Sequence, residues 1–174
     1  QGIDVVISSG DKDLAQLVNE HISIIDTMSG KVRDLAGVEA EFGVPARLML
    51  DYQMLVGDTV DNVPGVHKVG PKTAVKLLQE YGSVDALVAR ACEVKGAVGE
   101  NLRKAMDWLP TSRQLLTIKT DCDLNGWVPG MPALDAIRIG APQIAPLMAF
   151  CDTYGFKGLA RTLAGDAPAA APAP

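Results

Sequence analysis

One ten-residue segment, Gly65 to Ala74, constrains the fold of this 174-residue chain more than any other part of its sequence. It reads GVHKVGPKTA, so two glycines stand five residues apart and enclose two valines. Apolar residues at helical spacing precede and follow it, which predicts a helix on either side. Glycine permits the tight backbone turn that such a short connection needs. The pattern is typical of a helix-hairpin-helix.

This hairpin has the chemistry of a phosphate-binding surface. Glycine lets a phosphate approach the backbone, and the start of the next helix offers free N–H donors and a positive dipole end. Lys68, Lys72 and Lys76 recur every four residues, and the last two share a helix face. Such a hairpin contacts the phosphates of a nucleic-acid backbone and does not recognise the bases. The alternative is an ordinary helix turn with a solvated lysine face.

The whole sequence predicts the α/β class: a partial α/β sheet followed by a mostly helical helix-hairpin-helix DNA-binding subdomain. Short β-branched runs predict strands over 4–8 and 22–25. From Pro45 onward, helical spacing dominates. The other expected elements are helical turns over 38–42, helices over 45–56, 71–81 and 143–154, helix starts at Ser83, Asn101 and Thr111, and a strand or irregular segment over 117–120.

Two short loops carry pairs of carboxylates. Asp11 and Asp13 follow the first predicted strand, and Asp58 and Asp61 follow the helix that ends at Gly57. Ligand sites in open α/β sheets form at the C-terminal ends of strands. Hard oxygen ligands suit Mg²⁺ or Mn²⁺, which support phosphodiester hydrolysis by stabilising the attacking and leaving oxygens. For each loop alone, helix capping by aspartate is the competing interpretation.

The distribution of charge agrees with a metal site beside a phosphate-binding surface. The chain has a net charge of −5, which argues against a nonspecific polyanion binder. Residues 1–65 carry 4 basic and 11 acidic side chains, whereas residues 66–104 carry 7 basic and 4 acidic ones. Crowded carboxylates weaken a fold unless cations offset them. Solvated surface charge is the alternative explanation.

Composition excludes several other classes of protein. With 48% hydrophobic residues, most of the chain is not intrinsically disordered. No apolar run approaches the roughly 20 residues that span a bilayer. Cys92, Cys122 and Cys151 are scattered and form no CxxC pair, so we expect reduced thiols in a cytoplasmic protein without membrane contact.

The motifs described above resemble those of the 5′ nuclease (flap endonuclease-like) family. The strand-to-helix motif lies at 5–17, the acidic loop at 57–66 and the hairpin at 69–74. The resemblance covers about residues 1–163 and is greatest to the C-terminal part of the 5′–3′ exonuclease domain in the bacterial DNA polymerase I family. It implies a C-terminal remnant of the α/β nuclease core over 1–44, a helical subdomain over 45–163 with its helix-hairpin-helix at about 57–82, and an Ala/Pro-rich linker over 164–174.

The resemblance also implies a function and its residues. It implies a DNA replication and repair enzyme of the bacterial cytoplasm and nucleoid, which hydrolyses 5′ flaps, nicked strands or RNA primers. It implies a two-metal Mg²⁺ or Mn²⁺ site to which Asp11, Asp13, Asp58 and Asp61 belong. DNA backbone contacts are implied for Gly65, Lys68, Val69, Gly70, Lys72, Thr73 and Lys76. A monovalent cation, K⁺, is implied at Asn62, Val63 and Val66.

Family members also have an earlier half, with the first strands of the sheet and further metal ligands, to which nothing in this sequence corresponds. We therefore expect an incomplete metal site, exposed apolar surface near Ile7, and weak duplex binding without cleavage by this chain alone. The expected partners are DNA, the missing N-terminal half and the polymerase and proofreading domains of the parent enzyme. Two alternatives remain open: a non-catalytic helix-hairpin-helix module and a stand-alone 5′ nuclease.

Overall fold

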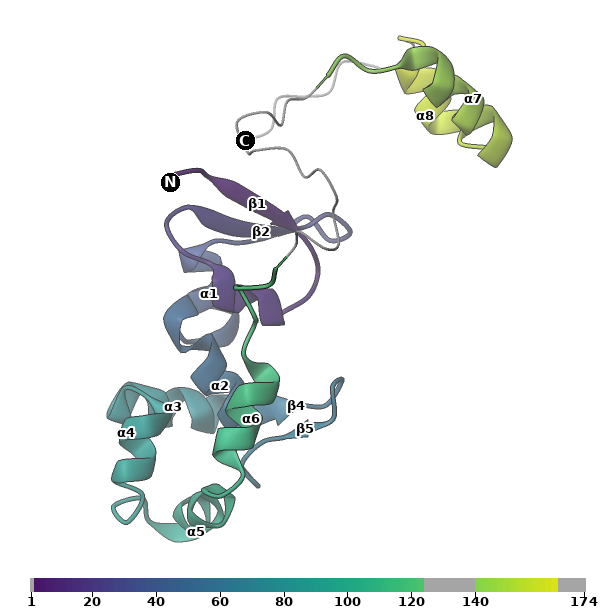
Figure 1. The fold of residues 1–174 in the computed structure, drawn as a ribbon. Helices are drawn as coiled ribbons and strands as arrows, with labels where there is room; N and C mark the ends of the chain where they lie inside the picture. The colour runs from purple at the N-terminus through teal and green to yellow at the C-terminus, as the bar shows by residue number, and fades with distance from the viewer. Residues whose placement is uncertain (1, 124–139, 166–174) are drawn as a thin grey trace. The chain divides into compact units, whose positions relative to one another are not determined.

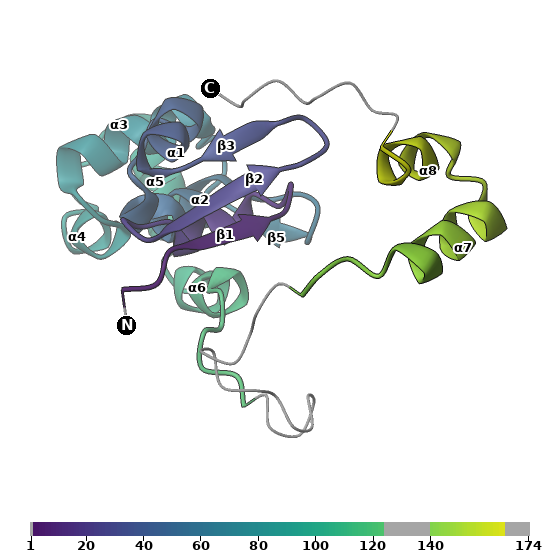
Figure 2. The ribbon, with the colours of Figure 1, turned by 90° about the horizontal axis from the view of Figure 1, so that it is seen from above.

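The computed structural model describes residues 2–123 and 140–165. The chain divides into two compact units, Gln1–Cys122 and Asp123–Pro174. The first unit is mixed α/β, as the sequence predicts, with a small sheet over a group of helices (Figure 1 and Figure 2). Of the linker expected over 164–174, residues 166–174 lie outside the described part of the chain.

Three strands form the sheet of the first unit, in the order β1 (Val5–Ser8), β2 (Ile22–Asp26) and β3 (Lys31–Arg33). β1 pairs with β2 in parallel, and β3 pairs with β2 antiparallel. Both strands predicted from the sequence are therefore confirmed. An apolar run such as that of β1 is typical of a buried strand, but here Val5 and Val6 are 43% and 67% exposed, and β1 lies at the edge of the sheet. The apolar surface expected to be exposed here is present.

The helical part follows the predicted order with two differences in its second half. Its elements are η1 (Asp13–Leu17), α1 (Leu35–Phe42), η2 (Ala46–Leu48), α2 (Met49–Val56), α3 (Pro71–Tyr81), α4 (Val84–Ala89), α5 (Gly96–Ala105) and α6 (Leu109–Leu116). Asn101 and Thr111 start no helix, because they lie inside α5 and α6. The proline that marks the first turn of α6 is Pro110. Residues 117–120 are irregular.

Helix α2 organises the first unit, because it contacts η1, η2, α3, α4, β4 and α6. Its buried side chains are Met49, Gln53, Met54 and Leu55. Burying each large apolar side chain among them contributes roughly 1.5–3 kcal/mol. α2 is thus the fixed element from which the following loop projects.

The loop that follows α2 is closed by a short antiparallel pair, β4 (Gly57–Asp58) with β5 (Val63–Pro64). Two glycines touch where it closes. A Cβ on Gly65 would lie 2.3 Å from the Val56 carbonyl carbon, and a Cβ on Gly57 would lie 2.3 Å from the Gly65 nitrogen. Gly57 also has a φ of +81°, a conformation that glycine adopts readily.

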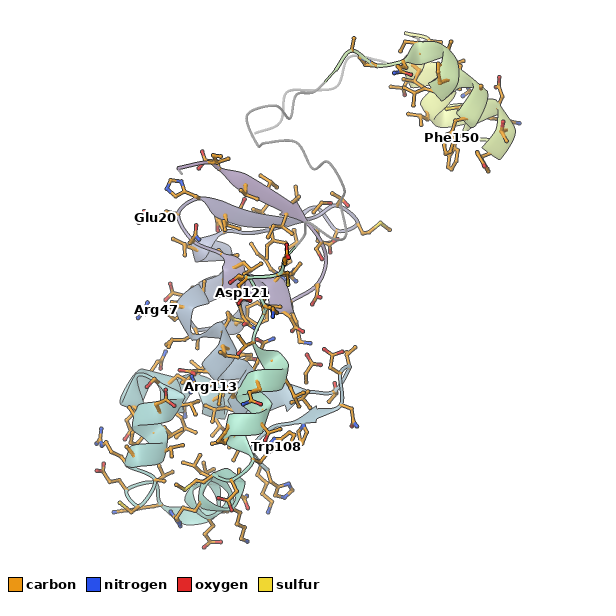
Figure 3. All side chains as sticks on the ribbon, viewed as in Figure 1. Glu20, Arg47, Trp108, Arg113, Asp121 and Phe150 are labelled. Atoms are coloured by element: carbon orange, nitrogen blue, oxygen red, sulfur yellow. The ribbon has the colours of Figure 1, made fainter. Side chains whose placement is uncertain are left out.

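Hydrogen bonds attach this loop to the helices on both sides. The Val66 N–H donates to the Leu55 carbonyl at 2.9 Å. The indole N–H of Trp108, labelled in Figure 3, donates to the Pro64 carbonyl at 2.8 Å. The closed loop is therefore held at its C-terminal end by α2 and by Trp108, the residue immediately before α6.

The second unit contains α7 (Ile144–Tyr154) and α8 (Lys157–Leu163), which pack against each other. The helix predicted over 143–154 is confirmed. Phe150 stacks on Phe156 with ring centroids 5.6 Å apart. Within residues 2–123 and 140–165, no helix combines the length and apolar character that crossing a membrane requires.

Gly65→Ala should destabilise the chain by about 2 kcal/mol or more, because the added methyl group overlaps backbone atoms that cannot rotate away. Gly70→Ala is the matched control: nothing lies within 4 Å of its Cβ position, so it should lose at most about 1 kcal/mol as a poorer N-cap. Urea unfolding followed by circular dichroism measures both variants. Equal losses of unfolding free energy would contradict the glycine contact.

Candidate metal centre and nucleic-acid interface

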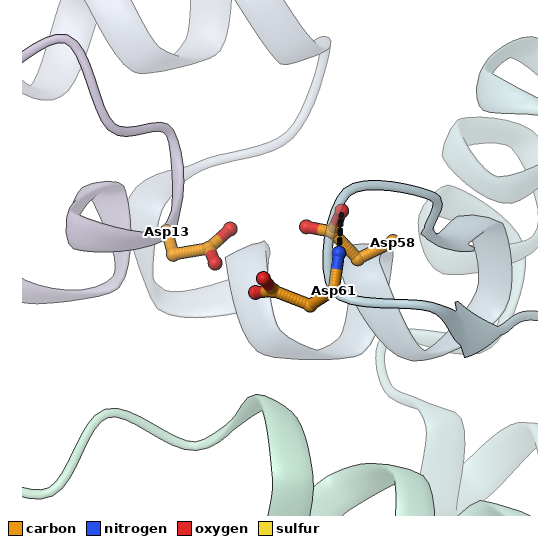
Figure 4. Close-up of side chains that lie close together, drawn as sticks. All are labelled: Asp13, Asp58 and Asp61. Carbon is orange, nitrogen blue, oxygen red and sulfur yellow. Dashed lines mark hydrogen bonds between the residues drawn. The ribbon is translucent and has the colours of Figure 1, made fainter.

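Three aspartates from two separate segments meet in the first unit. Asp13 begins η1, whereas Asp58 and Asp61 come from the closed loop after α2 (Figure 4). One carboxylate oxygen of each lies within 4.8 Å of those of the other two. Three hard oxygen donors around one point form a donor set that suits Mg²⁺ or Mn²⁺. The predicted convergence of the two loops is thus confirmed for these residues, and their role as metal ligands stays a prediction.

The closed loop itself fixes Asp58. This residue is only 2% exposed, and its Oδ1 accepts hydrogen bonds from the backbone N–H groups of Val60 at 2.8 Å and Asp61 at 3.4 Å. The second bond is the dashed line in Figure 4. Asp58 therefore shapes the turn that brings Asp61 beside it.

Asp11 lies next to the cluster without belonging to it. It is exposed and lines the same cleft as the three clustered aspartates. Its Oδ1 accepts a hydrogen bond from the Asp13 N–H at 3.0 Å, and its own N–H donates to Ser9 Oγ at 3.1 Å. The bond to the Asp13 N–H is a local turn before η1, whose N-cap position is Lys12, and the assignment of Asp11 as a metal ligand stays a prediction.

A lysine offsets the negative charge of the cluster. Lys12 Nζ lies 2.5 Å from Asp58 Oδ2 and 3.8 Å from Asp13 Oδ1. The hydrogen bond from Lys12 lowers the pKa of Asp58, and the same bond raises the pKa of Lys12. Burial raises the pKa of Asp13, because desolvation disfavours its charged form. A divalent cation that enters the cluster must therefore compete with an ammonium group.

The cluster opens into a cleft of about 450 Å³ whose wall includes Arg33 and Glu41. Arg33 Nε lies 2.7 Å from Glu41 Oε2, and a second guanidinium nitrogen donates to the Gly10 carbonyl at 3.3 Å. The hydrogen bond from Arg33 also lowers the pKa of Glu41. This contact anchors the loop before Asp13 to β3 and α1. Neither Arg33 nor Glu41 is predicted from the sequence, because nothing near them indicates that they reach this loop.

The predicted DNA-binding residues lie together on the turn before α3 and on its first turns. Val66 and Val69 are buried, and the Val69 N–H donates to the Val66 carbonyl at 2.9 Å. The side chains of Lys68, Lys72 and Lys76 are exposed. Gly65 packs against the backbone of Val56 and Gly57, and Thr73 is half-buried on α3.

Two features of this turn are not explained by its own packing. Gly70 is the N-cap of α3, and a side chain there would meet nothing within 4 Å. Lys68 has a φ of +64°, which costs a residue other than glycine about 1 kcal/mol. The Asn101 side chain of α5 donates to the neighbouring His67 carbonyl at 2.9 Å, so α5 supports the strained turn.

The structure brings together two of the three residues expected at a monovalent cation. Asn62 and Val63 line a second cleft of about 370 Å³, which also includes Gly65. Asn62 has a φ of +55°. Val66 is buried, does not line this cleft and donates its N–H to α2.

A family model described as "5′-3′ exonuclease, C-terminal SAM fold" matches residues 44–133. The chain is 41% identical to a DNA polymerase I of Rhizobium leguminosarum, over 94% of this chain but 16% of that protein. It is 40% identical to a 5′-3′ exonuclease of Aquifex aeolicus, over 72% of this chain and 42% of that one. The chain thus spans less than half the length of either relative.

A solved structure has a similar fold. It is a bacteriophage T5 flap endonuclease in complex with DNA and metal ions, with a TM-score of 0.61 and 20% identity. The match covers 65% of this chain and 42% of the T5 protein. At this identity the likeness shows the fold alone.

In EDTA, Lys12→Met should lower the free energy of unfolding by about 1 kcal/mol, as expected for a partly exposed ion pair. The aspartates then repel one another without a compensating cation. Mn²⁺ should raise the melting temperature of this variant more than that of the unaltered chain. Lys31→Met is the matched control, since Lys31 pairs with Glu41 at 2.9 Å on the same cleft but outside the cluster. Identical Mn²⁺-induced shifts for Lys12→Met and the unaltered chain would show that Lys12 does not compete with the ion.

Proposed function

This chain belongs to the 5′-3′ exonuclease family, and from that membership we propose that it is the C-terminal part of a 5′–3′ exonuclease domain of a bacterial DNA polymerase I. In this proposal it binds the backbone of duplex DNA and contributes carboxylates to divalent-metal hydrolysis of phosphodiester bonds in DNA replication and repair. The substrates are 5′ flaps, nicked strands and primer-containing duplexes.

The observation that carries this proposal is the convergence of Asp13, Asp58 and Asp61 within 4.8 Å. Their all-oxygen donor set fits Mg²⁺ or Mn²⁺, and Asp11 lines the same cleft. When bound, such ions stabilise the attacking and leaving oxygens of a phosphodiester. The chain itself contributes the fixed carboxylates and, in Lys12, a cation that occupies the cluster until the metal enters.

The hairpin supplies the grip on DNA. The exposed ammonium groups of Lys68, Lys72 and Lys76 and the open backbone at Gly70 lie on consecutive turns, as phosphate contacts require. Gly65, Val69 and Thr73 belong to the same proposed surface, although the Val69 N–H itself already donates to the Val66 carbonyl. We place a K⁺ ion in the second cleft, on Asn62 and Val63, and leave Val66 out because it does not line that cleft.

The remaining partners follow from the length of the relatives. We propose that β1, with its exposed Val5 and Val6, is covered by a preceding half of the nuclease domain, which completes the sheet and the metal site. Polymerase and proofreading domains follow in the parent enzyme, which works on the bacterial nucleoid. Alone, this chain binds duplex DNA weakly and does not cleave it.

Asp58→Asn tests the proposal that this chain contributes metal ligands to a nuclease. The substitution should weaken Mn²⁺ binding by the chain at least tenfold in a calorimetric titration, and should leave duplex affinity unchanged or higher because it removes a charge that repels phosphate. In a protein that also carries the preceding half, 5′-flap cleavage should fall at least a hundredfold. Glu39→Gln, at an exposed position on α1, is the control. Unaltered cleavage by Asp58→Asn would favour the non-catalytic DNA-binding module.

Lys68→Gly tests the hairpin. Glycine should stabilise the chain by about 1 kcal/mol by relieving the positive φ, yet weaken duplex binding for all sequences and reduce the salt slope of binding by about one. Lys72→Ala should weaken binding in the same way without the gain in stability. Fluorescence anisotropy at several salt concentrations and urea unfolding measure the two effects. If Lys68→Gly leaves the affinity for duplex DNA unchanged, Lys68 does not belong to the DNA interface.

A further inference from the structure

A buried amide lies directly behind the aspartate cluster. Gln53 of α2 is 2% exposed, among Met49, Met54 and Leu55. Its Nε2 donates a hydrogen bond of 2.5 Å to Asp13 Oδ1. An apolar side chain would pack at such a position without the cost of burying polar atoms. A buried amide at this position therefore indicates a specific hydrogen-bond partner.

A second glutamine fixes which way that amide points. Gln16 Nε2 donates to the Leu116 carbonyl at 2.8 Å, and Gln16 Oε1 accepts from the Ile118 N–H at 3.3 Å. These backbone groups cannot exchange roles, so the orientation of the Gln16 amide is determined. The same Nε2 donates to Gln53 Oε1 at 2.7 Å. Gln53 must therefore present its oxygen to Gln16 and its NH₂ group to Asp13.

This polarity matters at Asp13. An NH₂ donor favours an unprotonated carboxylate oxygen and fixes the plane of the carboxyl group. The carboxyl group of Asp13 points toward Asp58 and Asp61 (Figure 4). The bond from Gln53 Nε2 therefore holds the carboxyl group of Asp13 in this orientation.

We propose that Gln53 is a positioning residue for a divalent cation held by Asp13, Asp58 and Asp61, and that Gln16 connects it to the C-terminal end of α6. The inference rests on the proposed metal site. Purely structural needs would be met by Gln16 alone, since the backbone groups of Leu116 and Ile118 bond to Gln16 and not to Gln53. Gln53 adds the link to the carboxylate.

The test measures Mn²⁺ affinity by calorimetry in the complete chain. Gln53→Met keeps the length of the side chain but cannot donate, and should weaken binding about tenfold, the lower end of the range for residues that orient a metal ligand. Gln16→Met should also weaken binding, because the Gln53 amide is then free to turn. Ser112→Ala is the control: its hydroxyl is fully buried and has no hydrogen-bond partner in the described structure. Circular dichroism in EDTA checks that each variant is folded.

A double-mutant cycle separates positioning from general stability. In an Asp13→Asn background, adding Gln53→Met should cause no further loss of Mn²⁺ affinity, although it still changes the unfolding free energy. A further tenfold loss there would overturn the inference, since Gln53 would then act through another group. If Gln53→Met does not fold, Gln16→Met decides in the same cycle.

The outcomes distinguish this inference from the proposed function. Absence of saturable Mn²⁺ binding both by the unaltered chain and by a protein that also carries the preceding half would overturn the metal site and the role of Gln53 with it. A second outcome would overturn only the role of Gln53. In it, Asp58→Asn abolishes Mn²⁺ binding, but a folded Gln53→Met variant binds Mn²⁺ within twofold of the unaltered chain.

Discussion

Electrostatic repulsion among Asp13, Asp58 and Asp61 is the constraint on which the rest of the first unit depends. Their oxygens lie within 4.8 Å of one another, and three carboxylates so close are stable only with donors and cations around them. The chain supplies an ammonium group from Lys12, two backbone N–H groups at Asp58 and an amide at Asp13. Each comes from a different part of the chain, so the cluster exists only in the folded state.

Helix α2 makes that arrangement rigid. It presents Gln53 to Asp13 on one side, and at its C-terminal end it starts the loop that carries Asp58 and Asp61. The contact between Gly57 and Gly65 closes this loop and also sets where the hairpin begins. One nine-residue segment, residues 57–65, thus carries two of the clustered aspartates and leads into the hairpin, and its shape depends on two glycines.

Local signals in the sequence were sufficient for part of this picture. The β-branched runs of β1 and β2, and Gly57, Pro71 and Gly82 at helix ends, act through their own backbone and were predicted correctly. Asn101 misled because the favoured capping residues also occur inside helices. Lys12, Arg33 and Gln53 act on residues far along the chain, from 23 to 46 positions away, and a single sequence holds no record of such contacts. A glutamine on the core side of α2 was the one available hint.

The exposed edge of β1 has a consequence for handling the protein. Among the described residues β1 pairs with β2 alone, so its outer backbone groups and the valines beside them form a ready template for another strand. Two copies can satisfy each other there. An exposed strand edge of this kind favours association between copies, and a charged or proline residue on β1 would oppose it.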